Sequence, residues 1–205
     1  MTVNISYTTN SSPVTWFHIH KCFTPSIADK LLTFFPDHKE KPITGKRDGA
    51  NKFRQFVSKQ RTPELAKLFA DFETLALRHH FSDITGVDCT EGHLRIELCQ
   101  DGPGFYLDTH VDIPEKLITL QIYLGTGKED WGTTLYYPQG AVHRTVPFLH
   151  NSGWMGHKDA PLLHGVIKEK VDGLRKSVII NYVVGNWRDT EQLYDYASSE
   201  GDDLS

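Results

Sequence analysis

Residues 92–112 read GHLRIELCQDGPGFYLDTHVD and contain the strongest indication of the fold. Apolar and polar residues alternate over 93–98, which is typical of a strand with one buried face. The Gly-Pro-Gly sequence at 102–104 predicts a turn, and a second strand is expected over 105–111. This segment therefore predicts antiparallel β structure.

The rest of the chain continues the pattern. Further strands are expected at 14–20, 117–124, 133–137, 141–148, 161–167 and 176–184. Short strands at even spacing, joined by Gly, Pro and Asp turns, indicate a sandwich or barrel and not alternating strands and helices. Two helices that begin at Pro25 and Pro63 and run to about Phe35 and Ala76 are expected to brace one face. The basic stretch Lys41–Lys59 reads as a loop or irregular strand, with a solvated loop as the default and a lid over substrate as the alternative.

Length and composition favour one domain over residues 1–205, because 39% hydrophobic content is enough for one sizeable core. A net charge of −4 gives no electrostatic reason for nucleic-acid binding. Three cysteines without Cys-x-x-Cys spacing fit a reducing cytoplasm. The polar N-terminus lacks the features of a secretory signal, and no apolar run reaches the length of a membrane span. We therefore expect a cytoplasmic protein without membrane contact, which ends in an acidic tail at 189–205.

The second strand ends in Thr109-His110-Val111-Asp112, which provides two metal ligands. Residues separated by one position point to the same side of a strand, so both side chains can bind one ion. His164 is the candidate third ligand. Two imidazoles and one carboxylate are typical of non-haem Fe(II) and leave coordination positions open, although zinc enzymes use similar ligands. His157 is the alternative distal ligand.

Arg175 follows His164 by eleven residues, and Ser177 lies two positions further on. A guanidinium presents a planar fork that matches a carboxylate, and the serine can place a hydroxyl on the same face of a strand. Together with the metal ligands, this pair predicts a dicarboxylate ligand.

The pattern His-x-Asp, a distal His and Arg-x-Ser resembles the iron(II)- and 2-oxoglutarate-dependent oxygenase superfamily over residues 92–188. The resemblance implies a mainly β, double-stranded β-helix (jelly roll, cupin-like), with residues 1–91 as N-terminal helical support. It implies Fe(II) bound by His110, Asp112 and His164. It also implies that 2-oxoglutarate chelates this metal and meets Arg175 and Ser177 at its other carboxylate, with dioxygen as second co-substrate.

The resemblance also implies an activity. Hydroxylation of an unactivated C–H bond of a small molecule or a peptidyl residue is expected, coupled to decarboxylation of 2-oxoglutarate to succinate. The carboxylate of Asp112 favours hydroxylation, with desaturation as the alternative, because halogenating relatives carry a small residue there. Tyr123 is a further candidate for a hydrogen bond to the dicarboxylate, and Arg95 and Trp131 are candidates for substrate contact. Trp131 also stands where prolyl-hydroxylase-like members often have glycine, which weakens any transfer of prolyl specificity.

Two other functions remain open at this point. A cupin-like metal protein or oxygenase without 2-oxoglutarate would use the same metal ligands, but it has no need for an anion fork such as Arg175. A zinc hydrolase would need a positioned general base beside a metal-bound water, and the sequence does not mark one clearly.

Overall fold

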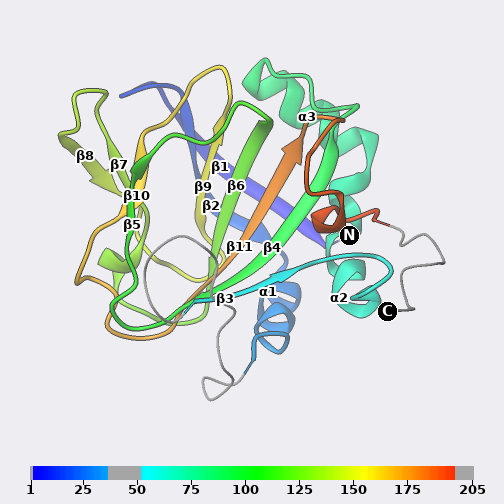
Figure 1. The fold of residues 1–205 in the computed structure, drawn as a ribbon, viewed down its shortest axis with the longest axis horizontal. Coiled ribbons are helices and arrows are strands. Elements are labelled where there is room, and N and C mark those ends of the chain that lie inside the picture. Colours follow the sequence, from blue (N-terminus) through cyan, green and yellow to red (C-terminus); the bar gives the residue numbers. More distant parts are fainter. Residues whose placement is uncertain (1, 37–51, 197–205) are drawn as a thin grey trace.

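The computed structural model describes residues 2–36 and 52–196. Two antiparallel sheets pack face to face, one with the strand order β1-β2-β9-β6-β11-β4-β3 and one with the order β5-β10-β7-β8 (Figure 1). The large sheet comprises β1 (Val3–Asn10), β2 (Trp16–Phe23), β3 (Lys52–Phe56), β4 (His93–Asp101), β6 (Lys116–Leu124), β9 (Gly153–His157) and β11 (Arg175–Val183). The small sheet comprises β5 (Leu107–His110), β7 (Thr134–Tyr136), β8 (Val142–Thr145) and β10 (His164–Val166). The predicted mainly β jelly roll is confirmed.

The helices lie on the face of the large sheet that is turned away from the small sheet (Figure 1). They are α1 (Pro25–Leu32), α2 (Pro63–Ala66), the 3₁₀ helix η1 (Lys67–Glu73) and α3 (Leu75–Thr85). The main apolar core fills the space between these helices and the large sheet, and a second cluster lies between the two sheets. In the part of the chain that the structure describes, no helix is long and apolar enough to cross a membrane.

The helix expected from Pro63 to Ala76 is divided in the structure. Its first part forms α2 and η1, and the chain is extended at Thr74 before α3 begins. The Thr74 hydroxyl accepts a hydrogen bond from the backbone N–H of Leu77 and caps α3. A residue that caps a helix N-terminus has extended backbone angles, so Thr74 ends the first helical segment.

Two strands of the large sheet, β1 and β9, were not predicted from the sequence, and the segment of a third, β3, was expected as a loop or irregular strand. β1 lies in a polar segment, and β9 contains Gly153, Gly156 and His157, which favoured a loop. β3 lies at the end of the stretch 41–59 and pairs with β4 as an edge strand. The first part of that stretch, in which a lid was considered, lies outside the described residues, as does the acidic tail beyond residue 196. The segment 1–91 therefore supplies strands as well as helices.

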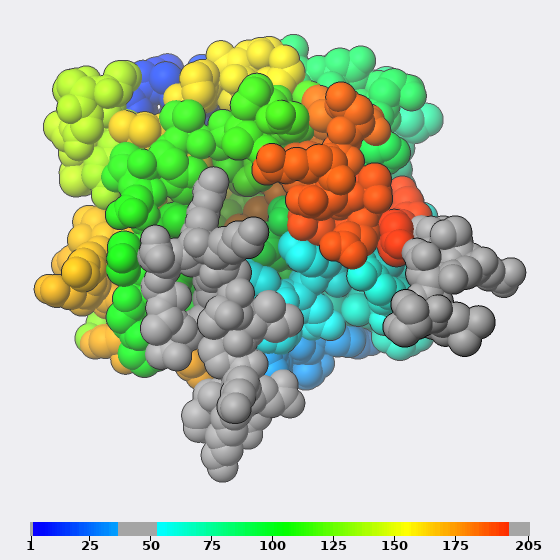
Figure 2. Space-filling model, viewed as in Figure 1, coloured from blue at the N-terminus to red at the C-terminus, as the bar shows by residue number. Residues whose placement is uncertain are grey.

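The C-terminal segment closes one end of the large sheet. The backbone N–H of Tyr194 donates to the carbonyl of Leu94, and the carbonyl of Tyr194 accepts from Lys59. In Figure 2 this orange-red segment covers the surface beside the cyan region that includes β3. The 3₁₀ helix η3 (Thr190–Gln192) lies within it and brings Gln192 to Arg95, whose Nε donates to Oε1 of Gln192 over 2.9 Å.

Gly153 provides a test of the β6–β9 pairing. A Cβ atom at this position would lie 1.8 Å from the carbonyl oxygen of Gln121 in β6, so the two strands would have to separate. We expect Gly153→Ala to lower the free energy of unfolding by about 3 kcal/mol or more. Gly185→Ala is the matched control, because no described atom lies within 4 Å of a Cβ there. Chemical denaturation compares the two variants, and equal stability would contradict the expected steric conflict.

Asp71 in η1 forms hydrogen bonds with the start of β1. Its carboxylate accepts hydrogen bonds from the backbone N–H groups of Thr2 (2.6 Å) and Val3 (2.9 Å). Burial raises the pKa of Asp71, but these hydrogen bonds outweigh burial and lower the pKa below its usual value. A carboxyl group with a lowered pKa in the folded state stabilises the fold above its unfolded pKa, and this contribution is lost as the pH falls through the folded pKa.

Asp71→Asn should therefore lower the free energy of unfolding by about 1 kcal/mol at pH 7. The difference between parent and variant should shrink below about pH 4, where the parent carboxyl becomes protonated. Urea titrations at pH 7 and at about pH 3 measure both values. An equal difference at the two pH values would show that the charge of Asp71 does not matter.

Candidate metal centre and adjoining cavities

His110, Asp112 and His164 meet between the two sheets. β5 and β10 are antiparallel neighbours in the small sheet, and His110 pairs with His164 in their register. Directly paired residues project to the same side of a sheet, so the two imidazoles lie side by side, with ring centroids 4.4 Å apart. Asp112 follows the end of β5. One ligand atom from each of the three residues lies within 4.8 Å of the others.

Hydrogen bonds orient both histidines in the same way. Nδ1 of His110 lies 2.8 Å from the carbonyl oxygen of Asp108, and Nδ1 of His164 lies 2.8 Å from the carbonyl oxygen of Leu162. Because a carbonyl oxygen can only accept, each ring carries its proton on Nδ1 and keeps a lone pair on Nε2. Metal-binding histidines are held by this kind of hydrogen bond. The donor set therefore fits a divalent metal.

The surroundings of Asp112 and His164 favour the protonation states that bind a metal. Burial raises the pKa of Asp112, but the charges of Lys116 and His164 and hydrogen bonds from Lys116 and Thr119 outweigh it and lower the pKa to about 2. Burial is the main cause that lowers the pKa of His164 to about 4. At neutral pH the site thus offers a carboxylate and an uncharged imidazole, as metal binding requires. Nζ of Lys116 lies 2.6 Å from Oδ1 of Asp112.

His157, the alternative distal ligand, lies on the opposite face of the large sheet. Along β9, Trp154 faces the small sheet, where its ring centroid lies 4.7 Å from that of His164. Side chains alternate along a strand, so His157 faces the helices. Its ring lies 6.4 Å from that of Phe17, a residue of the main core. His157 is not part of the three-ligand cluster, but it is among the residues that line a cavity next to Asp112 and His164.

Two cavities adjoin the three ligands. The inner cavity, of about 230 Å³, extends between the sheets from His110, Asp112 and His164 to Arg54 and Arg175. The outer cavity, of about 280 Å³, extends from the same metal site to the surface. Its lining is largely apolar and includes Val111, Ile113, Pro114, Trp154, Pro161 and Leu162. Residues shared by both cavities are Asp112, Lys116, Thr119, Trp154 and His164.

Arg175 lies at the inner end, where β11 begins, and its side chain is 2% exposed. Its Nε donates to the carbonyl oxygen of Trp131 over 2.6 Å, and Nη1 donates to Oδ2 of Asp101 over 2.7 Å. A longer contact of 3.4 Å joins Nη2 to Oγ1 of Thr133. A guanidinium has five N–H groups, so these contacts leave one on each terminal nitrogen. The Arg175 side chain also interacts with the phenol of Tyr123 through a hydrogen bond.

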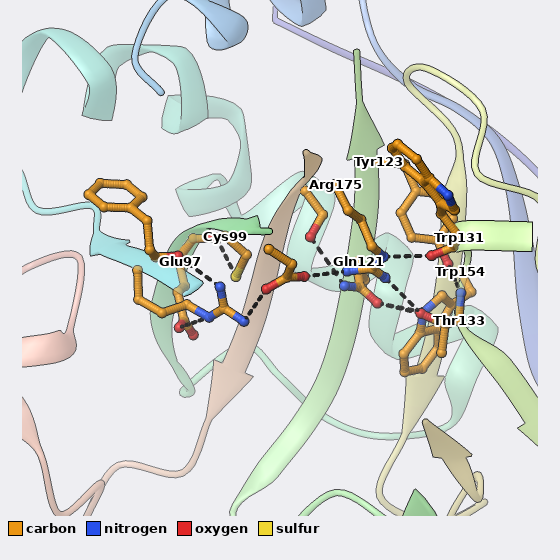
Figure 3. Close-up of polar contacts among 12 residues, drawn as sticks. Glu97, Cys99, Gln121, Tyr123, Trp131, Thr133, Trp154 and Arg175 are labelled. Atoms are coloured by element: carbon orange, nitrogen blue, oxygen red, sulfur yellow. Dashed lines mark hydrogen bonds and ion pairs between the residues drawn. The ribbon is translucent and has the colours of Figure 1, made fainter. Parts of the chain in front are cut away.

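The remaining candidates for co-substrate contact lie behind the cavity wall. Ser177 and Tyr123 are fully buried, and neither is among the described residues that line the inner cavity. Oγ of Ser177 accepts from Nε2 of Gln121 over 3.2 Å, and the Tyr123 hydroxyl accepts from the backbone N–H of Thr133 over 2.8 Å. Gln121 and Thr133 themselves line the cavity, and Figure 3 shows them beside Arg175. Contact of Ser177 and Tyr123 with a dicarboxylate stays a prediction.

Neither candidate for substrate contact lines the inner or the outer cavity, as far as the structure describes the chain. Arg95 is buried and binds Glu97, Asn181 and Gln192. The indole of Trp131 packs in the cluster between the sheets and donates to Asp172, while its carbonyl oxygen holds Arg175. Both residues thus support other side chains of the site.

Several residues that line the inner cavity were not identified from the sequence. Polar Thr119 and Gln121 alternate with apolar residues on β6, and their side chains face the small sheet. This alternation of polar residues within an apolar strand was the available signal. Arg54 and Asp101 gave no such signal, because polar residues of edge strands and strand ends are usually solvated.

Comparison with known proteins bears on this geometry. No protein-family model and no curated protein matches the chain. Among solved structures, a prolyl hydroxylase from Trichoplax adhaerens in complex with a hypoxia inducible factor peptide fragment aligns with a TM-score of 0.58 at 14% identity, over 82% of this chain and 83% of that one. An oxidoreductase of the 2OG-Fe(II) oxygenase family from Burkholderia pseudomallei aligns with a TM-score of 0.55 at 17% identity, over 77% and 78%. The chain has the fold of the 2OG-Fe(II) oxygenases.

A third structure of similar fold is a prolyl-4-hydroxylase from Pseudomonas putida, with a TM-score of 0.50 at 13% identity over 64% of this chain and 71% of that one. The 2OG-Fe(II) oxygenase fold agrees with the superfamily indicated by His-x-Asp, the distal His and Arg-x-Ser. The roles of individual residues depend on the geometry of this chain.

Proposed function

We propose that the protein is an Fe(II)- and 2-oxoglutarate-dependent dioxygenase that hydroxylates an unactivated C–H bond. One observation carries this proposal: the three clustered candidate ligands adjoin a cavity that extends to the guanidinium of Arg175. A metal site joined to an anion fork by such a cavity fits a co-substrate that chelates the metal at one end and carries a carboxylate at the other.

In this proposal, His110, Asp112 and His164 hold Fe(II), and the inner cavity binds 2-oxoglutarate. Once bound, iron and 2-oxoglutarate supply the oxidising chemistry, in which 2-oxoglutarate is decarboxylated to succinate and dioxygen is consumed. The protein contributes position and electrostatics. Arg175 orients the distal carboxylate through its terminal N–H groups. Trp154 packs against His164 and holds the position of its ring.

We assign the primary substrate to the outer cavity. Its volume of about 280 Å³ fits a small molecule or one side chain of a peptide, and its largely apolar lining suits an aliphatic group. The related structure from Trichoplax adhaerens contains a peptide fragment, which is consistent with a peptidyl substrate as one of these two classes. Asp112 and His164 line this cavity, so the reacting C–H bond would lie next to the metal.

A second candidate is a cupin-like metal protein or oxygenase that does not use 2-oxoglutarate. It is favoured by the ion pair between Arg175 and Asp101, because a carboxylate of the protein itself already neutralises the guanidinium. In that case the inner cavity would bind no dicarboxylate.

Anaerobic addition of Fe(II) and then 2-oxoglutarate to the purified protein distinguishes the two candidates. A visible metal-to-ligand charge-transfer band is expected in the parent and in His143→Ala, a matched control on β8, and is expected to be absent in His110→Ala. Succinate release then scores a screen of substrates. Iron binding without the band would overturn the proposal in favour of the cupin-like alternative.

A further inference from the structure

Arg175 is one end of a continuous row of five charged side chains on the inner face of the large sheet. Asp101 lies opposite Arg175 in the register of β4 and β11, and it joins Arg175 to Arg54 on β3. Glu97 then joins Arg54 to Arg95. The contacts along the row measure 2.7 Å, 2.6 Å, 3.4 Å and 3.0 Å from Arg175 to Arg95. Figure 3 shows Glu97 on the left and Arg175 near the centre, with the ion pairs of the row drawn between them.

The row contains three guanidinium groups and two carboxylates, so one positive charge has no counter-ion within it. The side chains of Asp101 and Arg175 are 1% and 2% exposed, and that of Arg54 is 20% exposed. Interactions between charges are stronger in such an environment than in water. Four members of the row line the inner cavity, where the charges of Arg54 and Arg175 balance those of Glu97 and Asp101, and Arg95 lies outside it.

Asp101 and Arg54 act on Arg175 in opposite ways. Asp101 occupies Nη1 of Arg175 and, alone, would cancel the charge that attracts an anion. Its second oxygen accepts from Nη2 of Arg54 over 2.6 Å, which restores one positive charge to the group. The same pairing fixes the carboxylate of Asp101, and Asp101 together with the Trp131 carbonyl fixes the plane of Arg175. The guanidinium of Arg175 therefore has a fixed orientation.

We propose that Arg54 is a positioning residue that gives this site its selectivity for a 2-oxo acid with a distal carboxylate, acting through Asp101 on Arg175. This inference rests on the proposed function, because it assigns a role in binding the same co-substrate. Arg54 offsets the negative charge of Asp101 and holds its carboxylate, Asp101 fixes the guanidinium of Arg175, and Arg175 contacts the carboxylate of the co-substrate.

The test compares two ligands of equal chain length, 2-oxoglutarate and 2-oxopentanoate, of which only the first has a distal carboxylate. Binding to the Mn(II)-loaded protein is measured by calorimetry, so the readout does not depend on turnover. Arg54→Gln should weaken the binding of 2-oxoglutarate about tenfold. It should leave the binding of 2-oxopentanoate within about twofold of the parent, since an uncharged end group does not sense the lost charge. Arg54→Lys should restore most of the affinity.

Two further variants separate this role from a structural one. Arg61→Gln removes a positive charge at an exposed position near β3, outside both cavities, and should change neither affinity. Glu97→Gln removes a negative charge from the row, so 2-oxoglutarate should bind several-fold more tightly, whereas a damaged site would bind it more weakly. Thermal unfolding of each variant establishes that it is folded.

The outcomes distinguish this inference from the proposed function. Equal weakening of both ligands in Arg54→Gln, or no change in either, would overturn the role of Arg54 while the proposed function stands. A parent protein that binds Mn(II) but not 2-oxoglutarate would overturn both.

Discussion

Replacing Asp112 by asparagine should weaken the binding of a divalent metal about a hundredfold or more, because loss of a residue that merely supports a ligand already costs roughly 10- to 100-fold. Asparagine keeps the shape of the side chain but removes the charge that pairs with Lys116 and faces the two imidazoles. Calorimetric titration with Mn(II), and with Fe(II) under anaerobic conditions, measures the affinity. The apo-protein should remain folded, since Asp112 lies at the end of β5 and is only half-buried.

Asp108→Asn is the matched control, because this exposed carboxylate on β5 contributes only its carbonyl oxygen to the site. His157→Ala is a second control on the opposite face of the large sheet. Both should bind metal like the parent. Metal binding that survives in His164→Ala and is lost in His157→Ala would show that the distal ligand was chosen wrongly.

The three candidate metal ligands could be identified from the sequence for two reasons. Two of them are one position apart on a strand, and the third was chosen by its spacing from Arg175. His110 and Asp112 are separated by one position at the end of a strand, so their common direction follows from strand geometry alone. The choice of His164 over His157 depended on its spacing from Arg175. In the structure, the register of β5 and β10 gives this choice a physical basis, because it places His164 opposite His110.

The missed elements depend on long-range pairing. β9 contains two glycines, which usually indicate a loop. In the sheet, however, Gly153 allows a close approach to the backbone of β6 that a side chain would prevent. Pairing with the neighbouring strand makes this segment a strand, so its own sequence does not reveal it. The same holds for β3, an edge strand whose position is decided by β4.

The residues that hold Arg175 in place could not be identified from the sequence either. Asp101 precedes the Gly-Pro-Gly turn, where an acidic residue is ordinarily solvated. The pairing of β4 with β11 turns it into the buried counter-ion of Arg175, 74 positions away in the chain. Arg95 and Trp131 were expected at the substrate, and in the structure they contact Glu97 and Arg175, which line the inner cavity.

Arg175→Gln should reduce the affinity for 2-oxoglutarate by about a hundredfold or more. Two charge-assisted hydrogen bonds to a carboxylate are lost, and each contributes about 1.5–3 kcal/mol. Binding of 2-oxopentanoate should change little, since its chelating end meets only the metal. In turnover assays of the Fe(II)-loaded protein, the main effect should be a raised requirement for 2-oxoglutarate.

The same substitution should also destabilise the fold, because breaking a buried ion pair leaves a charge without its partner and costs about 3–5 kcal/mol. Arg54 continues to bind Asp101 and reduces this cost, so the variant should still fold. Lys176→Gln is the matched control, because the adjacent side chain points to the other face of β11 and should leave both affinities unchanged. If Arg175→Gln binds 2-oxoglutarate as tightly as the parent does, the distal carboxylate does not lie at Arg175, and the ion pair with Asp101 is the whole role of this arginine.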